Sequence, residues 1–271
     1  MFRSVIACVL VFMSAVIGSA QTAPQKPGPL DNLVATPNPL TRPTQVDAGV
    51  AGPWRRAMRE KYEGKFPGPA PRTPEGKPDL NGVWIAEGTP ERPAMTPLGL
   101  KLLEDRYKTN LKDFPYSVCL PPAVVPNTDA MGGLWVVMHN RTHFATLFEY
   151  PPNYRLVLLD GRPHPPDVEP AWMGHSIGMW EGDTMVVDSI GFNDRSWLPS
   201  LLPHTAKLHI TERWTRTAMG AMSVELIHED PDIFVKPWKI VFRLFLAPGE
   251  TLMENICENN KFPQLSEGQN K

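Results

Sequence analysis

The sequence carries little net charge and has no long apolar run after its first twenty residues. Its 27 Lys and Arg and 29 Asp and Glu leave a formal charge of −2. The basic residues form no stripe along the chain, which argues against a nucleic-acid partner. No segment beyond the N-terminus has the roughly 20 apolar residues of a membrane-spanning helix. We therefore expect no nucleic-acid binding and no stable membrane insertion.

The common cofactor and nucleophile motifs are also missing. The chain has no HExxH, no CxxC, no Rossmann fingerprint and no Walker loop. The letters G-x-S-x-G occur at 174–178, but a predicted hairpin follows them, whereas a nucleophile elbow needs a following helix. The sequence therefore predicts no cofactor, and a serine hydrolase is not favoured.

Residues 1–20 are typical of a cleaved signal peptide. Arg3 precedes an apolar run at 5–17, and the small residues Gly18, Ser19 and Ala20 follow it. This run is too short to span a membrane as a helix. We predict cleavage near Ala20 and a periplasmic or secreted protein.

Cysteine is scarce, with three in 271 residues. Cys8 lies within the signal peptide, so the mature chain keeps Cys119 and Cys257. In an oxidising compartment such a pair is a candidate disulfide, and two buried thiols are the alternative. The chain-entropy model gives roughly 5 kcal/mol as an upper bound for closing so long a loop.

Proline is concentrated near the N-terminus, where residues 22–78 hold 12 of the 31 prolines. Proline fixes φ and removes a backbone donor, so this stretch cannot form a regular sheet. We expect a proline-rich extension at 21–78 with one short helix at 53–63, a folded domain at 79–262, and a flexible tail at 263–271. A second helix is predicted after Thr96, with Thr96 as its N-cap.

The rest of the chain has the period-two alternation of β-strands. Short turns such as Glu181-Gly182-Asp183 and Pro248-Gly249 separate the apolar runs. Many short strands with close turns indicate an all-β antiparallel fold, and a closed barrel removes exposed sheet edges. The expected strands are 79–85, 134–139, 143–150, 154–159, 175–180, 184–190, 207–217, 222–229, 238–246 and 251–257.

Candidate catalytic residues are His175, Asp188 and Glu212, since histidine beside a carboxylate suits acid–base chemistry. We expect His175 to point into the barrel, although a histidine bonded in the core or at the rim is the alternative. Asp188 is either an acid with a raised pKa or the cap of the Gly191–Asp194 turn. Glu212 shares its face with apolar residues, so it is expected to point inward and to bind a ligand or pair with Arg155.

Five further side chains are candidate ligand contacts: Tyr154, Arg155, His164, Trp180 and His209. A metal site using His164, His175, His204 and His209 is a weaker hypothesis, because their spacing matches no compact zinc motif. We therefore predict no bound metal.

Several motifs together resemble an uncharacterised family of secreted soil-bacterial proteins. They are GRPHP at 161–165, WMGHSIGMWEGDTMVVDSIGFND at 172–194, PHT at 203–205 and LHITERW at 208–214, with PDLNGVW, CLPP and ENICENNK further out. The resemblance covers roughly residues 71–261. It implies export and a lipocalin-like β-barrel, and it implies no reaction.

We expect an exported barrel that binds a small, partly apolar molecule in its mouth or lumen. An acid–base enzyme of the same shape, a lyase, isomerase or hydrolase, is the first alternative. The second is an envelope interaction protein that makes contacts through its proline-rich segment.

Overall fold

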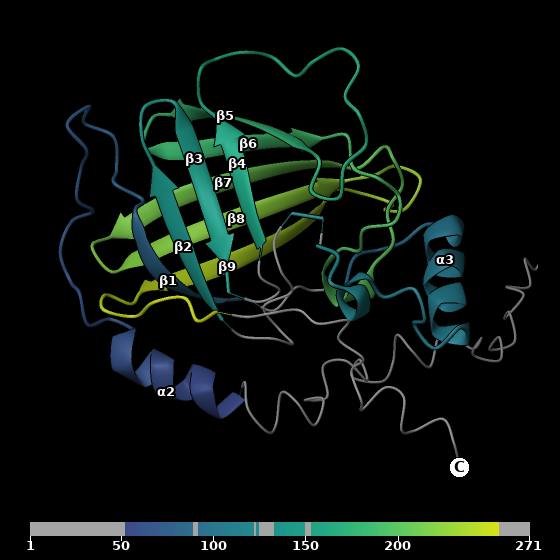
Figure 1. The fold of residues 1–271 in the computed structure, drawn as a ribbon, viewed down its shortest axis with the longest axis horizontal. Helices are drawn as coiled ribbons and strands as arrows, with labels where there is room; N and C mark the ends of the chain where they lie inside the picture. The colour runs from purple at the N-terminus through teal and green to yellow at the C-terminus, as the bar shows by residue number, and fades with distance from the viewer. Residues whose placement is uncertain (1–51, 89–91, 122, 125–132, 150–152, 255–271) are drawn as a thin grey trace, which may run out of the picture.

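A computed structural model describes residues 52–88, 92–121, 123–124, 133–149 and 153–254, and this part forms a closed barrel (Figure 1). The expectation of a β-barrel is confirmed. Its nine strands in the described residues are β1 (Gly82–Glu87), β2 (Leu134–His139), β3 (His143–Phe148), β4 (Asn153–Leu158), β5 (His175–Glu181), β6 (Thr184–Ile190), β7 (His209–Ala218), β8 (Ala221–Glu229) and β9 (Trp238–Leu246).

Each strand pairs with the next one along the chain, and β1 closes the barrel on β9. All of these pairs are antiparallel except β4 and β5, which are parallel and share one register pair, Leu158 with Ile177. The expectation of a wholly antiparallel barrel is therefore wrong. The 159–174 connection returns the chain to the end where β4 began, so β5 runs in the same direction.

The lipocalin-like part of the expectation is not confirmed. Lipocalin barrels close from eight up-and-down strands, whereas this barrel has nine strands in its described residues and one parallel pair. The structure supports the coarser description of a mixed nine-strand barrel.

Aromatic side chains fill the barrel interior. Burial alternates along β7, β8 and β9, which is the pattern of strands with one face turned to a core. Trp214 lies at the centre of the cluster, with ring centroids 5.1 Å from Phe144 and 6.2 Å from Trp135. Phe242 packs on Trp135 from β9 at 5.7 Å. The described lumen is thus occupied by protein side chains.

Two α-helices in the described residues lie outside the barrel (Figure 1). Helix α2 (Gly52–Tyr62) packs Met58 and Tyr62 on the outer side of β1 and β2, against Ile85 and Leu134. Helix α3 (Pro97–Lys108) lies at one end of the barrel. Both helices are confirmed, as is the Thr96 cap, whose Oγ1 accepts a hydrogen bond from the Gly99 N–H at 3.1 Å. No helix in the described residues is long and apolar enough to cross a membrane.

Residues 66–81, which we call the strap, cross the other end of the barrel. The Phe66 carbonyl accepts a hydrogen bond from Gly220 at the β7–β8 turn. Arg72 forms an ion pair with Asp183 at the β5–β6 turn, with an N–O distance of 2.6 Å. The end of the proline-rich extension is therefore held against the barrel end by these contacts.

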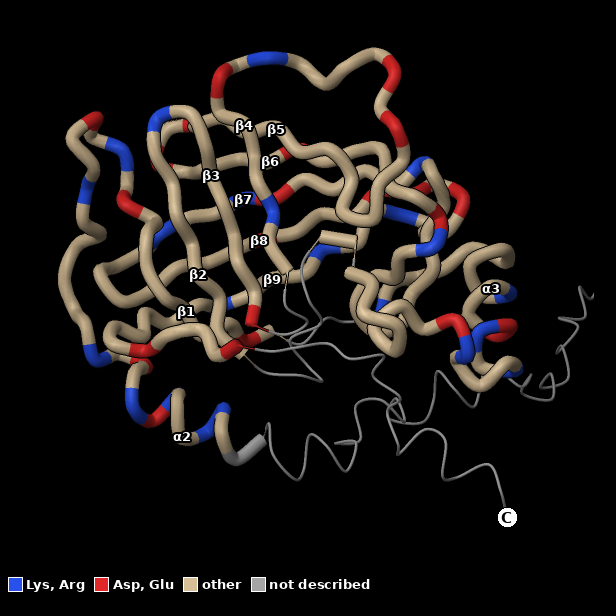
Figure 2. The backbone as a smooth tube through the Cα atoms, in the orientation of Figure 1, with Lys and Arg blue, Asp and Glu red and all other residues tan. Residues whose placement is uncertain are grey.

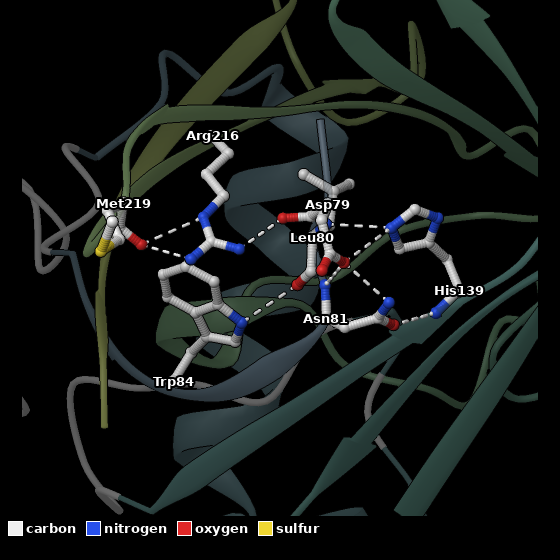
Figure 3. Close-up of polar contacts among 7 residues, drawn as sticks. All are labelled: Asp79, Leu80, Asn81, Trp84, His139, Arg216 and Met219. Carbon is white, nitrogen blue, oxygen red and sulfur yellow. Dashed lines mark hydrogen bonds and ion pairs between the residues drawn. The ribbon is translucent and has the colours of Figure 1, made fainter. Parts of the chain in front are cut away.

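A hydrogen-bond network fixes the end of the strap (Figure 3). Arg216 donates to the carbonyls of Asp79 and Met219. The Leu80 N–H donates to His139 Nε2 at 2.9 Å. The Trp84 indole donates to the Leu80 carbonyl at 3.2 Å. The strap thereby joins strands β1, β2 and β7.

One predicted strand is wrong in the part that the structure describes. Residues 251–254 form no strand, so Pro248-Gly249 does not close a last hairpin. The edge of β9 is already paired with β1, which leaves no ladder for a further strand. Instead, the Met253 N–H donates to Glu149 Oε1 at 2.9 Å.

Three expectations fall on parts of the chain outside the described residues. The signal peptide and the tail at 263–271 lie there, and so does Cys257. Cys119 ends the short helix η2 (Pro115–Val118) with φ of 63°. The disulfide between the two cysteines stays a prediction.

Candidate functional site

Glu212 points into the barrel and forms a two-pronged ion pair with Arg155. Their side chains are 0% and 4% exposed, and Arg155 Nη2 lies 2.8 Å from Glu212 Oε2. The Trp214 indole also donates to Glu212 Oε2, at 2.9 Å. The inward direction of Glu212 and its pairing with Arg155 are confirmed. Because the two charges are paired with each other in a packed interior, we interpret the ion pair as a structural element.

A second group of titratable side chains lies on the outer wall. In β6 the side chain of Asp188 is 42% exposed, whereas its neighbours Val187 and Ser189 are fully buried. On β7, His209 is 38% exposed and likewise faces outward. These residues belong to what we call the outer histidine cluster: His164, His175, Asp188, His209 and Glu229.

His175 also faces outward, so the expectation that it points into the lumen is wrong. Its strand neighbour Ile177 is the register partner of Asp188, and residues two apart share a face. The inner positions of β5 are taken by Ser176 and Gly178. A Cβ at Gly178 would lie 2.8 Å from the Leu159 side chain, so only a glycine fits that inner position without rearrangement.

The cluster forms a continuous chain of contacts. His175 Nδ1 lies 2.8 Å from His164 Nδ1, and His164 Nε2 lies 3.6 Å from Asp188 Oδ2. His209 Nε2 is hydrogen-bonded to the other Asp188 oxygen. His209 Nδ1 lies 3.3 Å from Glu229 Oε2 across the β7–β8 ladder. Three imidazoles and two carboxylates are thus linked.

The contacts set the charges of the cluster. The hydrogen bond from His209 lowers the pKa of Asp188, so the expected raised pKa is wrong. The same bond raises the pKa of His209, which favours its imidazolium form. Burial lowers the pKa of His164 despite the attraction of Asp188, which favours a neutral ring. The contacts of the cluster thus lower the pKa values of Asp188 and His164 and raise that of His209.

Asp188 does not cap the turn that follows β6. Asn193 does so, since its Oδ1 accepts hydrogen bonds from the N–H groups of Arg195 and Ser196 at 3.0 Å. Asp188 instead makes its contacts across strands, to His209 on β7 and His164 on the 159–174 connection. It is therefore available to orient histidines.

The tautomers follow from these contacts. His164 Nε2 is buried and has no hydrogen-bond partner in the described residues, and Asp188 Oδ2 lies 3.6 Å from it, so the carboxylate attracts a proton placed on Nε2. His164 Nδ1 is then an acceptor, so His175 Nδ1 must donate. His175 Nε2 is left with its lone pair, and no described residue forms a hydrogen bond to it. In this arrangement of tautomers the chain of contacts ends at His175 Nε2.

The remaining sequence candidates lie elsewhere. Tyr154 is 72% exposed on the outer side of β4. Trp180 lies at the strap end, with its ring centroid 5.8 Å from that of His139. His204 is buried and bonded to Ser196 at 2.7 Å. No group of three or more His, Cys, Asp or Glu in the described part of the chain is arranged to hold a metal ion.

Glu229 is the cluster member that sequence reasoning missed. It pairs with His209 because β7 and β8 form one hairpin around residues 218–221. Counting outward from the turn pair Ala218 and Ala221 would place residue 209 opposite residue 230, and the bulge between Arg216 and Ala218 shifts the register by one residue to Glu229. The pairing therefore depends on a bulge that no local motif in the sequence indicates.

No family model matches the chain, and neither the curated proteins nor the solved structures contain a match. The resemblance to a family of secreted proteins accordingly stays an expectation. What the chain can do is argued from the geometry of the outer histidine cluster.

Proposed function

We propose that the protein is an exported acid–base enzyme that acts on a small molecule at the outer histidine cluster, with His175 as the general base. The observation that carries this proposal is the line of contacts from Asp188 through His164 to His175. A carboxylate that orients an imidazole is a recurring element of acid–base sites.

Each member of the cluster has a separate role in the proposal. Asp188 holds the proton of His164 on Nε2, and His164 in turn fixes the orientation of the His175 ring. His209 keeps Asp188 ionised through its hydrogen bond. Asp188, His164 and His209 are thus positioning residues, and His175 Nε2 accepts the proton of the substrate.

The packing of the barrel favours the outer wall over the lumen as the place for this chemistry. The interior positions hold Trp84, Trp135 and Trp214, which are all at most 2% exposed. Glu212 and Arg155 already bind each other there. We therefore keep the expected small, partly apolar ligand and move its proposed site to the outer histidine cluster.

A base-catalysed elimination tests the proposal without knowledge of the natural substrate. We expect the protein to speed the ring opening of 5-nitrobenzisoxazole, in which a base removes one carbon-bound proton. A positioned general base contributes roughly 100-fold or more, so His175→Gln should lower the rate by about that factor. Asp188→Asn should also lower it, because the tautomer of His164 is no longer fixed.

The matched control is His143→Gln. His143 is half-buried at the start of β3, and it bonds Thr142 and not the cluster. This variant should keep the rate of the parent protein. A His175→Gln protein that keeps full activity, or an equal loss in both variants, contradicts the proposal.

A further inference from the structure

The outer wall of the barrel is divided by charge. From β2 to β5 the outward positions carry no Asp, Glu, Lys or Arg, apart from Glu181 at the β5–β6 turn. On β8 and β9, by contrast, outward ion pairs such as Lys239–Glu225 occur. Figure 2 marks the positions of Lys, Arg, Asp and Glu along the backbone. We call the uncharged part the apolar outer face: Val136, Met138, Ala145, Leu147, Tyr154, Leu156, Leu158, Ile177 and Met179.

Large side chains on this face are exposed. Tyr154 is 72% exposed, Met179 56%, Leu156 52% and Met138 48%. Scattered exposed apolar residues are normal on protein surfaces, but a contiguous group marks a binding surface. Met138, Ala145 and Leu156 are contiguous, because they are successive register partners across three strands. The apolar outer face is therefore a candidate binding surface.

The apolar outer face ends at the outer histidine cluster. Register partners run from His143 on β3 to Leu158, then to Ile177 on β5 and to Asp188 on β6. Neighbouring strands lie about 4.8 Å apart. An apolar group on Leu158 and Ile177 is thus within about 10 Å of the cluster, which is roughly the length of two fused aromatic rings.

The charges of the cluster select the polar end of such a ligand. The cluster holds two carboxyl groups, Asp188 and Glu229, and His209 lies between them, with a pKa that its hydrogen bond to Asp188 raises. An anionic group is therefore disfavoured. With its lone pair, His175 Nε2 can accept a hydrogen bond from a donor group of the ligand.

We propose, on the basis of the function proposed above, that the substrate is a neutral apolar molecule with a hydroxyl group, such as a phenol or an alcohol. Its apolar body lies on the apolar outer face around Ile177, Leu156 and Met179, and its hydroxyl donates to His175 Nε2. In the acid–base step the O–H bond breaks, the proton moves to His175 Nε2, and the electron pair stays on the substrate oxygen.

Three naphthalenes test the polar end in binding titrations with the full mature chain. We expect 2-naphthol to bind about tenfold more tightly than 2-methoxynaphthalene, which has the same body and no donor, since tenfold corresponds to one ordinary hydrogen bond. We expect 2-naphthoate, which is anionic, to bind more weakly than 2-naphthol. Tighter binding of the naphthoate, or equal binding of all three, overturns the inference.

Charged substitutions test the apolar body. Met179→Lys and Leu156→Lys should weaken 2-naphthol binding fivefold or more. Val241→Lys is the matched control, because Val241 is 43% exposed on the outer side of β9, away from the proposed site. It should leave the affinity unchanged. Unchanged binding in both Met179→Lys and Leu156→Lys overturns the inference.

Two further results separate this inference from the proposed function. If the apolar-face variants bind 2-naphthol normally while His175→Gln still slows the benzisoxazole reaction, the substrate class is wrong and the acid–base function stands. If His175→Gln leaves that reaction unchanged, the function itself is wrong. A dimer in sedimentation that Met179→Lys dissociates would assign the face to a second copy and overturn the inference.

Discussion

At the scale of single residues, burial gives the histidines of this protein opposite charge preferences. His209 is half-exposed beside two carboxylates, and its hydrogen bond to Asp188 raises its pKa. His228 is fully buried, with its ring centroid 4.7 Å from that of Trp238. Burial lowers the pKa of His228 to about 4. The position of His209 thus favours the charged form of its ring, whereas burial favours the neutral form of the His228 ring.

His228 makes the stability of the protein depend on pH. Its pKa in the folded protein, about 4, lies below the ordinary histidine value of 6.5. Between these values the unfolded chain binds a proton that the folded chain does not, so stability falls as pH falls. We expect a loss on the order of 2 to 3 kcal/mol from pH 7 to pH 4.5. In urea unfolding, the free energy of unfolding of His228→Gln should fall between pH 7 and pH 4.5 by about 2 to 3 kcal/mol less than that of the parent protein.

His143→Gln again serves as the control, because His143 is half-buried at the start of β3. Its pH dependence should follow that of the parent protein. His204, whose pKa is also lowered by burial, is present in both proteins, and its repulsion of a protonated His228 is part of the effect that the comparison measures. Parallel curves for His228→Gln and the parent protein would show that His228 does not carry the effect.

At the scale of elements, the strap is held to the barrel by separate hydrogen bonds and an ion pair and not by a strand ladder, so it should open before the barrel does. Arg216 holds it through the carbonyl of Asp79 and also donates to the Met219 carbonyl in the β7–β8 turn, and its guanidinium lies 5.0 Å from the centroid of the Trp84 ring (Figure 3). Arg216→Met keeps much of the packing over Trp84 and removes these donors. We expect amide exchange in residues 77–81 to accelerate about tenfold or more, which corresponds to roughly 1.4 kcal/mol.

Amide exchange of the barrel strands is the internal control. Amides in β7 and β8 pair with each other along the whole hairpin and should keep their protection. Faster exchange everywhere would mean that Arg216 supports the whole barrel. No change at residues 77–81 would mean that the bonds of His139 and Trp84 hold the strap without it.

The elements that the sequence predicts well are those fixed by local pattern. Eight strands from 134–139 to 238–246 match the structure within a few residues, because alternation is a property of neighbouring residues. The direction of β5 depends on how a 16-residue connection without a helix crosses the barrel, and no local pattern encodes that. The strand predicted at 251–257 failed because β1, far away in sequence, already occupies the edge of β9.

The candidate site was predictable where the two faces of a strand differ in polarity. Glu212 shares its face with Ile210 and Trp214, so its inward direction could be inferred. Both faces of β5 carry apolar residues, so the pattern did not indicate which way His175 points. The inner face was decided by space at Gly178, which is a property of the packed barrel.

At the scale of the whole molecule, the barrel serves as a rigid support for its outer wall. Aromatic rings fill the lumen, the strap crosses one end, and α3 lies at the other (Figure 1). The alternation of a strand then leaves one set of side chains free to face outward. On strands β5 to β7 the outward side chains include His175, Asp188 and His209, and the barrel holds them in fixed positions.

Cys119 and Cys257 are predicted to form a disulfide in the exported protein. Cys119 lies between α3 and β2, whereas Cys257 follows Met253, whose N–H binds Glu149 at the end of β3. Protein isolated from the periplasm should begin at Gln21 if the signal peptide is cleaved. In the same protein, no cysteine should react with iodoacetamide under denaturing conditions until a reductant is added. Cys257→Ser should lower the free energy of unfolding by up to roughly 5 kcal/mol. Two labelled cysteines without reductant would rule out the disulfide, and an intact N-terminus would rule out export with cleavage.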